Sequence, residues 1–103
     1  MELARAGEFS LRFSGYKGTV CVVVTGDVDS AAADQLRCLL RDVIDGQGNP
    51  SVVIDATGVA VIDSAGLLVL TEASRLIREQ GGRLVVTPPR RDARRVFELA
   101  GLG

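Results

Sequence analysis

The chain has 103 residues, of which 47% are hydrophobic and 4% aromatic, and its formal net charge is −1. This length suits one globular domain with an aliphatic core, placed over residues 1–103 with residues 1–7 as a flexible N-terminal tail. A nearly neutral chain offers no long-range field that would favour nucleic acid or an anionic membrane. No apolar run approaches the ~20 residues of a membrane span, and the N-terminus lacks the features of a secretory signal. A cytoplasmic protein is therefore expected.

Two strands are expected first, over residues 8–15 and 19–25, because apolar and β-branched residues dominate both and a glycine-rich turn separates them. A helix over residues 30–45 follows, since apolar side chains such as Leu36 and Leu40 recur there at helical spacing.

The second half of the chain continues with a β-branched run, residues 51–55, that predicts a strand covered on both faces. Thr57 and Gly58 predict a turn after it. The remaining expected elements are a helix over residues 64–80, a strand over 83–87 and a helix over 91–100. The order β-β-α-β-α-β-α predicts an α/β fold with a mixed sheet, whose parallel strands are joined by right-handed helical crossovers.

Ser64 is the residue of greatest interest, because it lies where the pattern changes from strand to helix. Asp63 or Ser64 is expected to be the N-cap, which accepts hydrogen bonds from unpaired backbone N–H groups. Gly66 is expected to leave the backbone beside the serine uncovered, so that a partner surface can approach closely. The similar sequence at Asp29 and Ser30 also precedes a helix, and there capping alone is expected.

These motifs resemble, in order, those of the STAS domain (sulfate transporter and anti-sigma-factor antagonist), and most closely those of free-standing bacterial anti-sigma-factor antagonists. Residues 26–29, GDVD, resemble the family's Gly-x-x-Asp, and residues 54–59 resemble its Asp-Leu-Ser/Thr turn. Residues 62–66, IDSAG, are similar to its Asp-Ser-Ser/Thr-Gly phosphorylation site, with Ala65 in place of a second hydroxyl residue. The usual C-terminal strand and helix that follow the Gly-Leu sequence are lacking before Gly103.

The resemblance implies partner switching. The unmodified antagonist would bind an anti-sigma factor that is also a serine kinase, and so free a sigma factor for transcription. The kinase, with its own ATP, would phosphorylate Ser64 and release the antagonist, and a serine phosphatase would reset it. Partner contacts are implied for Asp27, Asp29, Asp63, Ala65 and Gly66. Turn and capping chemistry is an equal alternative for the three aspartates. A monomer or weak dimer is expected.

Other roles for the same fold stay open at this point: an accessory subunit of a transport ATPase, a scaffold of a stress-sensing complex, or a fragment of a larger regulatory protein. In the first two, Ser64 would be a cap or a simple contact.

An enzyme is not expected, because a chain without histidine cannot assemble a Ser-His-Asp triad. No phosphate-binding loop or zinc ligand set is recognisable, so neither cofactor nor metal is expected. The arginines at 90, 91, 94 and 95 are interpreted as a solvated helix face, with partner contact as the alternative.

Overall fold

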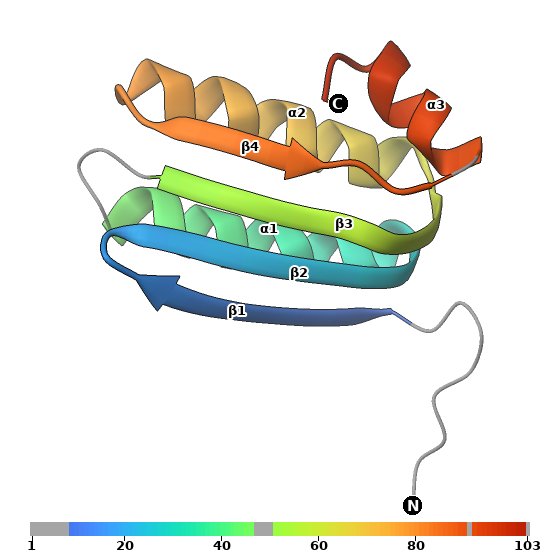
Figure 1. Ribbon diagram of the computed structural model, residues 1–103, viewed down its shortest axis with the longest axis horizontal. Helices are drawn as coiled ribbons and strands as arrows, with labels where there is room; N and C mark the ends of the chain where they lie inside the picture. Colours follow the sequence, from blue (N-terminus) through green and yellow to red (C-terminus); the bar gives the residue numbers. More distant parts are fainter. Residues whose placement is uncertain (1–8, 47–50, 91, 103) are drawn as a thin grey trace, which may run out of the picture.

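A computed structural model describes residues 9–46, 51–90 and 92–102, so the expected N-terminal tail lies outside the described residues. The elements follow in the expected order (Figure 1). They are β1 (Ser10–Tyr16), β2 (Thr19–Val28), α1 (Ser30–Gly46), β3 (Ser51–Ile62), α2 (Ser64–Glu79), β4 (Arg83–Thr87) and α3 (Asp92–Leu99).

The four strands form one sheet in the order β1-β2-β3-β4, with β1 antiparallel to β2 and the other pairs parallel. The hairpin between β1 and β2 turns at Lys17 and Gly18, whose φ angles are 50° and 81°. Two successive positive φ angles are typical of the type I′ turn, whose twist matches that of the flanking strands. The mixed sheet and the order of elements predicted from the sequence are confirmed.

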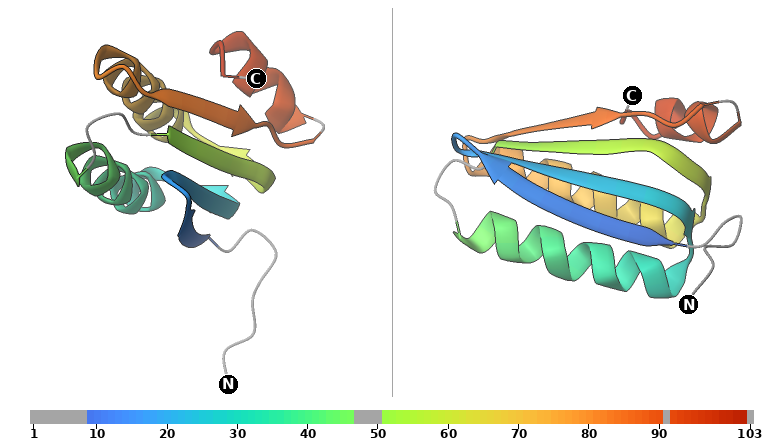
Figure 2. Two further views of the ribbon diagram at one scale, coloured as in Figure 1. Left: turned by 60° about the vertical axis from the view of Figure 1, so that its left-hand side comes forward. Right: turned by 60° about the horizontal axis from the view of Figure 1, so that its bottom comes forward.

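Helices α1 and α2 lie together on one face of the sheet, and α3 lies near the carboxyl end of β4, where it contacts β3 (Figure 2). Along β2 every second side chain is buried and its neighbours are half-buried, because successive side chains point to opposite faces. The core between sheet and helices is aliphatic except for Phe97 of α3, which is 0% exposed. Its other most buried members include Val22, Ile54, Leu36, Leu40 and Ile77.

The expected turn at Thr57 and Gly58 is wrong, because β3 runs without interruption from residue 51 to residue 62. Its pairing with β2 shifts twice. Between the pairs Val23↔Asp55 and Thr25↔Gly58, β2 advances by two residues and β3 by three. Between Gly26↔Val59 and Asp27↔Val61, β2 advances by one and β3 by two. Each shift is a bulge that accommodates turn-like residues within a strand.

The first bulge is held by the Asp55 side chain, whose Oδ1 accepts hydrogen bonds from the Thr57 hydroxyl at 2.7 Å and the Thr57 N–H at 3.0 Å. Gly58 fits beside Thr25, since a Cβ at this glycine would lie 2.8 Å from the Thr25 Cγ2. Local side-chain bonding and a small residue, which are signals of a turn, serve here to bend a strand.

The two bonds from Thr57, the hydroxyl bond first, lower the pKa of Asp55 below its ordinary value. A carboxyl whose pKa is lowered by folding stabilises the folded state above its unfolded pKa of about 3.9, and this contribution is lost as the pH falls through the lower folded value. We therefore expect Asp55→Asn to be less stable than the wild type near pH 7, with a difference that shrinks below about pH 4. Urea unfolding near pH 7 and below about pH 4 measures this difference in the free energy of unfolding. Asp42→Asn on the exposed face of α1 is the control. A difference that grows with acidity would contradict the assignment.

Candidate functional site

The candidate site lies where α1 and α2 begin, at the carboxyl ends of two neighbouring parallel strands (Figure 1). Val28 and Ile62, the last residues of β2 and β3, are paired in register. The next residue, Asp63, donates its N–H to the carbonyl oxygen of Val28 at 3.1 Å. This pairing brings the starts of two parallel helices to the same edge of the sheet.

Both helices begin with an aspartate cap. The Asp29 Oδ1 accepts a hydrogen bond from the Ala32 N–H at 2.9 Å, and the Asp63 Oδ1 accepts one from the Gly66 N–H at 3.1 Å. Of the two expected caps for α2, Asp63 is therefore correct, and in α1 the cap is Asp29 and not Ser30. Ser64 is the first residue of α2 and is exposed. Its hydroxyl makes no hydrogen bond within the described part of the chain, so it is available to a partner.

The surroundings of Ser64 are acidic. Asp27 lies beyond the strand end expected at residue 25, but it belongs to β2, as the partner of Val61 in β3. The structure brings Asp29 and Asp63 to the two helix starts, while Asp27 lies one residue before the end of its strand. None of these three carboxylates takes part in an ion pair with another described residue. A phosphate at this edge would therefore add to an uncompensated negative charge.

Gly66 has a different role from the expected one. It is buried, so it does not leave an open stretch of backbone for a partner. A Cβ at this position would lie 2.8 Å from the Cγ1 atoms of both Ile62 and Val28. The glycine therefore lets the first turn of α2 pack directly on the ends of β2 and β3. Ala65 beside it is half-buried and packs against the core.

We expect Gly66→Ala to lower the free energy of unfolding by up to about 2 kcal/mol, because overpacking of about 1–3 kcal/mol outweighs the gain of roughly 1 kcal/mol from the better helix propensity of alanine. The control is Gly46→Ala at the end of α1, where a Cβ would meet nothing within 4 Å. That variant should match or slightly exceed the wild type. Chemical denaturation measures both, and equal stability of the two variants would contradict the close-packing role of Gly66.

Two exposed apolar side chains near the site were missed in the sequence. Val61, near the end of β3, is 58% exposed. Leu68 of α2, one helical turn after Ser64, is 67% exposed. Leu68 falls outside the apolar stripe of α2 that contains Val69 and Ala73. This position in the sequence was the available signal that the Leu68 side chain is exposed. The serine is thus accompanied by apolar as well as acidic surface.

Within residues 9–46, 51–90 and 92–102, no group of three or more acidic, cysteine or histidine side chains is arranged to hold a metal ion. Among the same residues, no helix is both long and apolar enough to cross a bilayer. The site presents the free hydroxyl of Ser64 at the N-terminus of α2, next in sequence to the capping carboxylate of Asp63.

The STAS domain family model matches residues 10–103, so the chain belongs to the STAS domain family. An anti-sigma factor antagonist from Mycobacterium paratuberculosis is 26% identical with a TM-score of 0.79, over 97% of this chain and 84% of that one. The Bacillus cell fate determinant SpoIIAA in its phosphorylated form is 25% identical with a TM-score of 0.74, over 93% and 86%.

Unphosphorylated SpoIIAA, an anti-sigma factor antagonist, shares the fold at 24% identity, with a TM-score of 0.78 over 93% of this chain and 83% of that one. No curated protein sequence matches the chain significantly. The chain therefore resembles anti-sigma factor antagonists over most of its length, and the expected STAS fold is confirmed.

Proposed function

We propose that this protein is a cytoplasmic anti-sigma-factor antagonist that binds an anti-sigma factor with serine kinase activity and is released when Ser64 is phosphorylated. The observation that carries the proposal is the exposed Ser64 hydroxyl, which has no hydrogen-bond partner in the described chain. The similarity to antagonists, one of them in a phosphorylated form, supports it. In this role the protein acts by binding and is not an enzyme.

In the proposed reaction the kinase transfers the γ-phosphoryl group of ATP to the Ser64 Oγ. The bond between the γ-phosphorus and the bridging oxygen breaks, ADP leaves, and the serine hydroxyl proton passes to a base of the kinase. The chain supplies only the acceptor hydroxyl. A serine phosphatase reverses the modification by hydrolysis.

The fold tolerates the phosphate for an electrostatic reason. The group adds about −1.5 to −2 charges at the N-terminus of α2, where free backbone N–H groups and the helix dipole favour an anion. The domain therefore stays folded after modification. A change of partner affinity must then come from the surface and not from unfolding.

At the interface the same charge opposes binding. Asp29 and Asp63 already place uncompensated carboxylates at this edge, so neither of them can neutralise a phosphate. A partner that covers Ser64 would have to desolvate the phosphate beside these carboxylates. We propose that Asp27, Asp29 and Asp63 border the contact, and that Ala65 is part of its edge. Gly66 supports the site only from within.

The experiment is a capture from native cell extract with wild type, Ser64→Ala and Ser64→Glu as baits, followed by incubation of the captured kinase with ATP and mapping of the phosphate. We expect a small ATP-binding kinase to be retained by Ser64→Ala and lost by Ser64→Glu. Phosphate should appear on wild type and on Ser30→Ala, but not on Ser64→Ala. Transporter subunits retained equally by all baits would instead identify an accessory module, and would overturn the proposal.

A further inference from the structure

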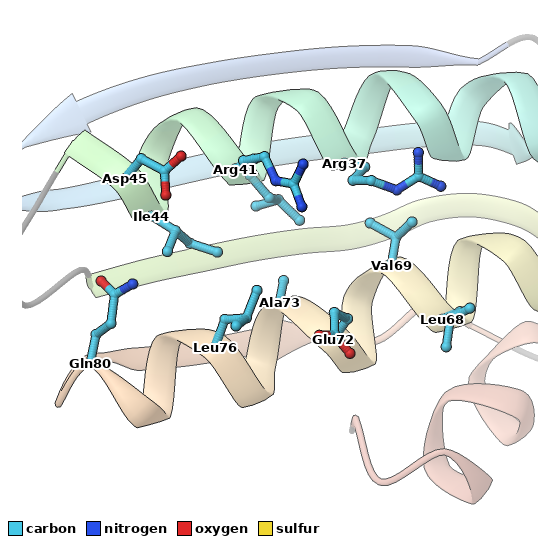
Figure 3. A pocket seen from close by; sticks show the side chains of 11 residues that line it. Arg37, Arg41, Ile44, Asp45, Leu68, Val69, Glu72, Ala73, Leu76 and Gln80 are labelled. Atoms are coloured by element: carbon cyan, nitrogen blue, oxygen red, sulfur yellow. The ribbon is translucent and has the colours of Figure 1, made fainter.

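A groove of about 520 Å³ runs between α1 and α2, on the side of the domain where the helices cover the sheet (Figure 3). Its floor is apolar and comes from both helices. The floor residues are Leu40 and Ile44 of α1 and Val69 and Ala73 of α2, and all four are buried. Because Ala73 is small, the space between the two helices is left open above it.

The α2 side of the groove is bordered by Leu68, which is 67% exposed, and by Leu76. A single exposed leucine on a surface needs no explanation. Here, however, Leu68 continues the apolar floor outward, so the groove and its border form one strip. An apolar groove with an exposed apolar side chain at its border is a feature that sites of protein interaction share.

The α1 side of the groove carries Arg37 and Arg41, which are one helical turn apart and lie along α1 (Figure 3). Arg37 is hydrogen-bonded to Asp34 at 2.8 Å, whereas Arg41 has no ion-pair partner among the described residues. Asp45 lies at the end of the groove farthest from Leu68 (Figure 3). The α1 side therefore presents a free cation at mid-length and an acid at one end.

Charges on the α2 side are already satisfied within that helix. Glu72 borders the groove but pairs with Arg75, and Arg75 also bonds Glu79 at 2.6 Å. The unpaired charges of the described groove residues are consequently those of Arg41 at mid-length and Asp45 at one end. The complement of Arg41 is an acidic side chain at the middle of the occupant, on the flank that faces α1.

We infer that this groove receives an amphipathic helix of the anti-sigma partner, whose apolar stripe lies along the floor and whose acidic flank faces Arg41. A helix suits a groove between two helices, because its side-chain ridges fit between theirs. The identity of the partner rests on the proposed function. Leu68 connects the two surfaces, since it follows Ser64 by four residues and so lies on the same face of α2.

The middle of the groove is distant from Ser64, although its Leu68 end lies about one helical turn away. From Ser64 to Ala73 the helix axis rises by roughly 13 Å, which exceeds the Debye length of about 8 Å at physiological ionic strength. Phosphorylation therefore weakens the contact at Ser64 and leaves the contact in the middle of the groove in place. The phosphorylated antagonist would keep a weak hold on its kinase.

The test uses two synthetic helical peptides of about four turns that share one leucine stripe and differ in one flank, glutamate in one and lysine in the other. Binding is followed by NMR titration of the full ¹⁵N-labelled chain. We expect the glutamate peptide to shift the amide signals of Leu68, Ala73 and Arg41 and to bind about tenfold more tightly than the lysine peptide.

Matched variants separate charge from apolar contact. Arg41→Glu should abolish or reverse the preference for the glutamate peptide, and Arg12→Glu, an exposed change on β1, should not. Leu68→Ser should weaken both peptides, and Leu99→Ser, at a leucine 78% exposed on α3, should weaken neither. Equal affinity for the two peptides, or shifts confined to other surfaces, would overturn the inference.

Ser64→Glu should bind the glutamate peptide as the wild type does, which keeps the two proposals separable. If Ser64 variants bind the kinase equally while the peptide preference holds, the phosphoswitch is wrong and the groove site is supported. If Ser64→Glu loses the kinase but the peptides show no preference, the groove inference is wrong and the phosphoswitch is supported.

Discussion

Replacing Ser64 with glutamate is expected to weaken binding of the purified anti-sigma kinase by about 30- to 150-fold relative to Ser64→Ala. The physical reason is a new carboxylate that the partner must desolvate beside Asp29 and Asp63, at a cost of about 2–3 kcal/mol. Calorimetric titration measures the affinities, and circular dichroism should show both variants equally folded, because a helix N-terminus accommodates an anion.

The matched control is Ser14→Glu on the exposed edge strand β1, which makes the same change of net charge far from α2. It should bind the kinase as the wild type does. An equal loss of affinity in Ser14→Glu and Ser64→Glu would mean that overall charge, and not the position of Ser64, controls binding. The dependence of the Ser64→Glu effect on salt is a second check, since screening should reduce it.

Truncating Phe97 to alanine is expected to lower the free energy of unfolding by about 3–5 kcal/mol. Phe97 is 0% exposed and is the only aromatic residue in the buried core cluster of the described chain. Its loss removes apolar contacts and leaves a cavity that the neighbouring aliphatic side chains fill only in part. Since small domains have a total stability of about 5–15 kcal/mol, a large part of the margin is lost.

Urea unfolding followed by circular dichroism measures this effect, with Leu99→Ala as the control on the same helix. Leu99 is 78% exposed, so its truncation should change stability by no more than about 0.5 kcal/mol. A Phe97→Ala variant as stable as Leu99→Ala would show that α3 does not close the core. The pair also tests whether α3 is an integral part of the domain.

The elements of the fold could be predicted because their local signals agree with their packing. The apolar spacing of Leu36 and Leu40 predicts α1, and both side chains are buried. β3 could not be delimited in this way, because Asp55, Thr57 and Gly58 have turn propensity and only pairing with β2 shows that they form a bulge. Pairing between distant segments overrides local preference there.

In the candidate site, too, some features could be predicted from the sequence and others could not. The start of α2 was predicted from the change of pattern, with Asp63 and Ser64 as the alternative caps, since capping depends on neighbours in sequence, and the structure shows that Asp63 is the cap. The burial of Gly66 could not be predicted, because it depends on Val28 from another strand. Nor could the groove, because it requires the relative placement of Arg41 and Leu68 on two separate helices.

The sequential strand order β1-β2-β3-β4 bears on how the chain folds as it leaves the ribosome. Every strand pairs with the one synthesised just before it, so the sheet can grow at one edge without waiting for distant segments. The start of α2, with Ser64, forms once β2 and β3 have paired. Phe97 arrives later, with α3, and completes the core. The edge that presents Ser64 is thus assembled before the domain gains its full stability, and the nascent chain depends on its last described helix to keep that edge folded.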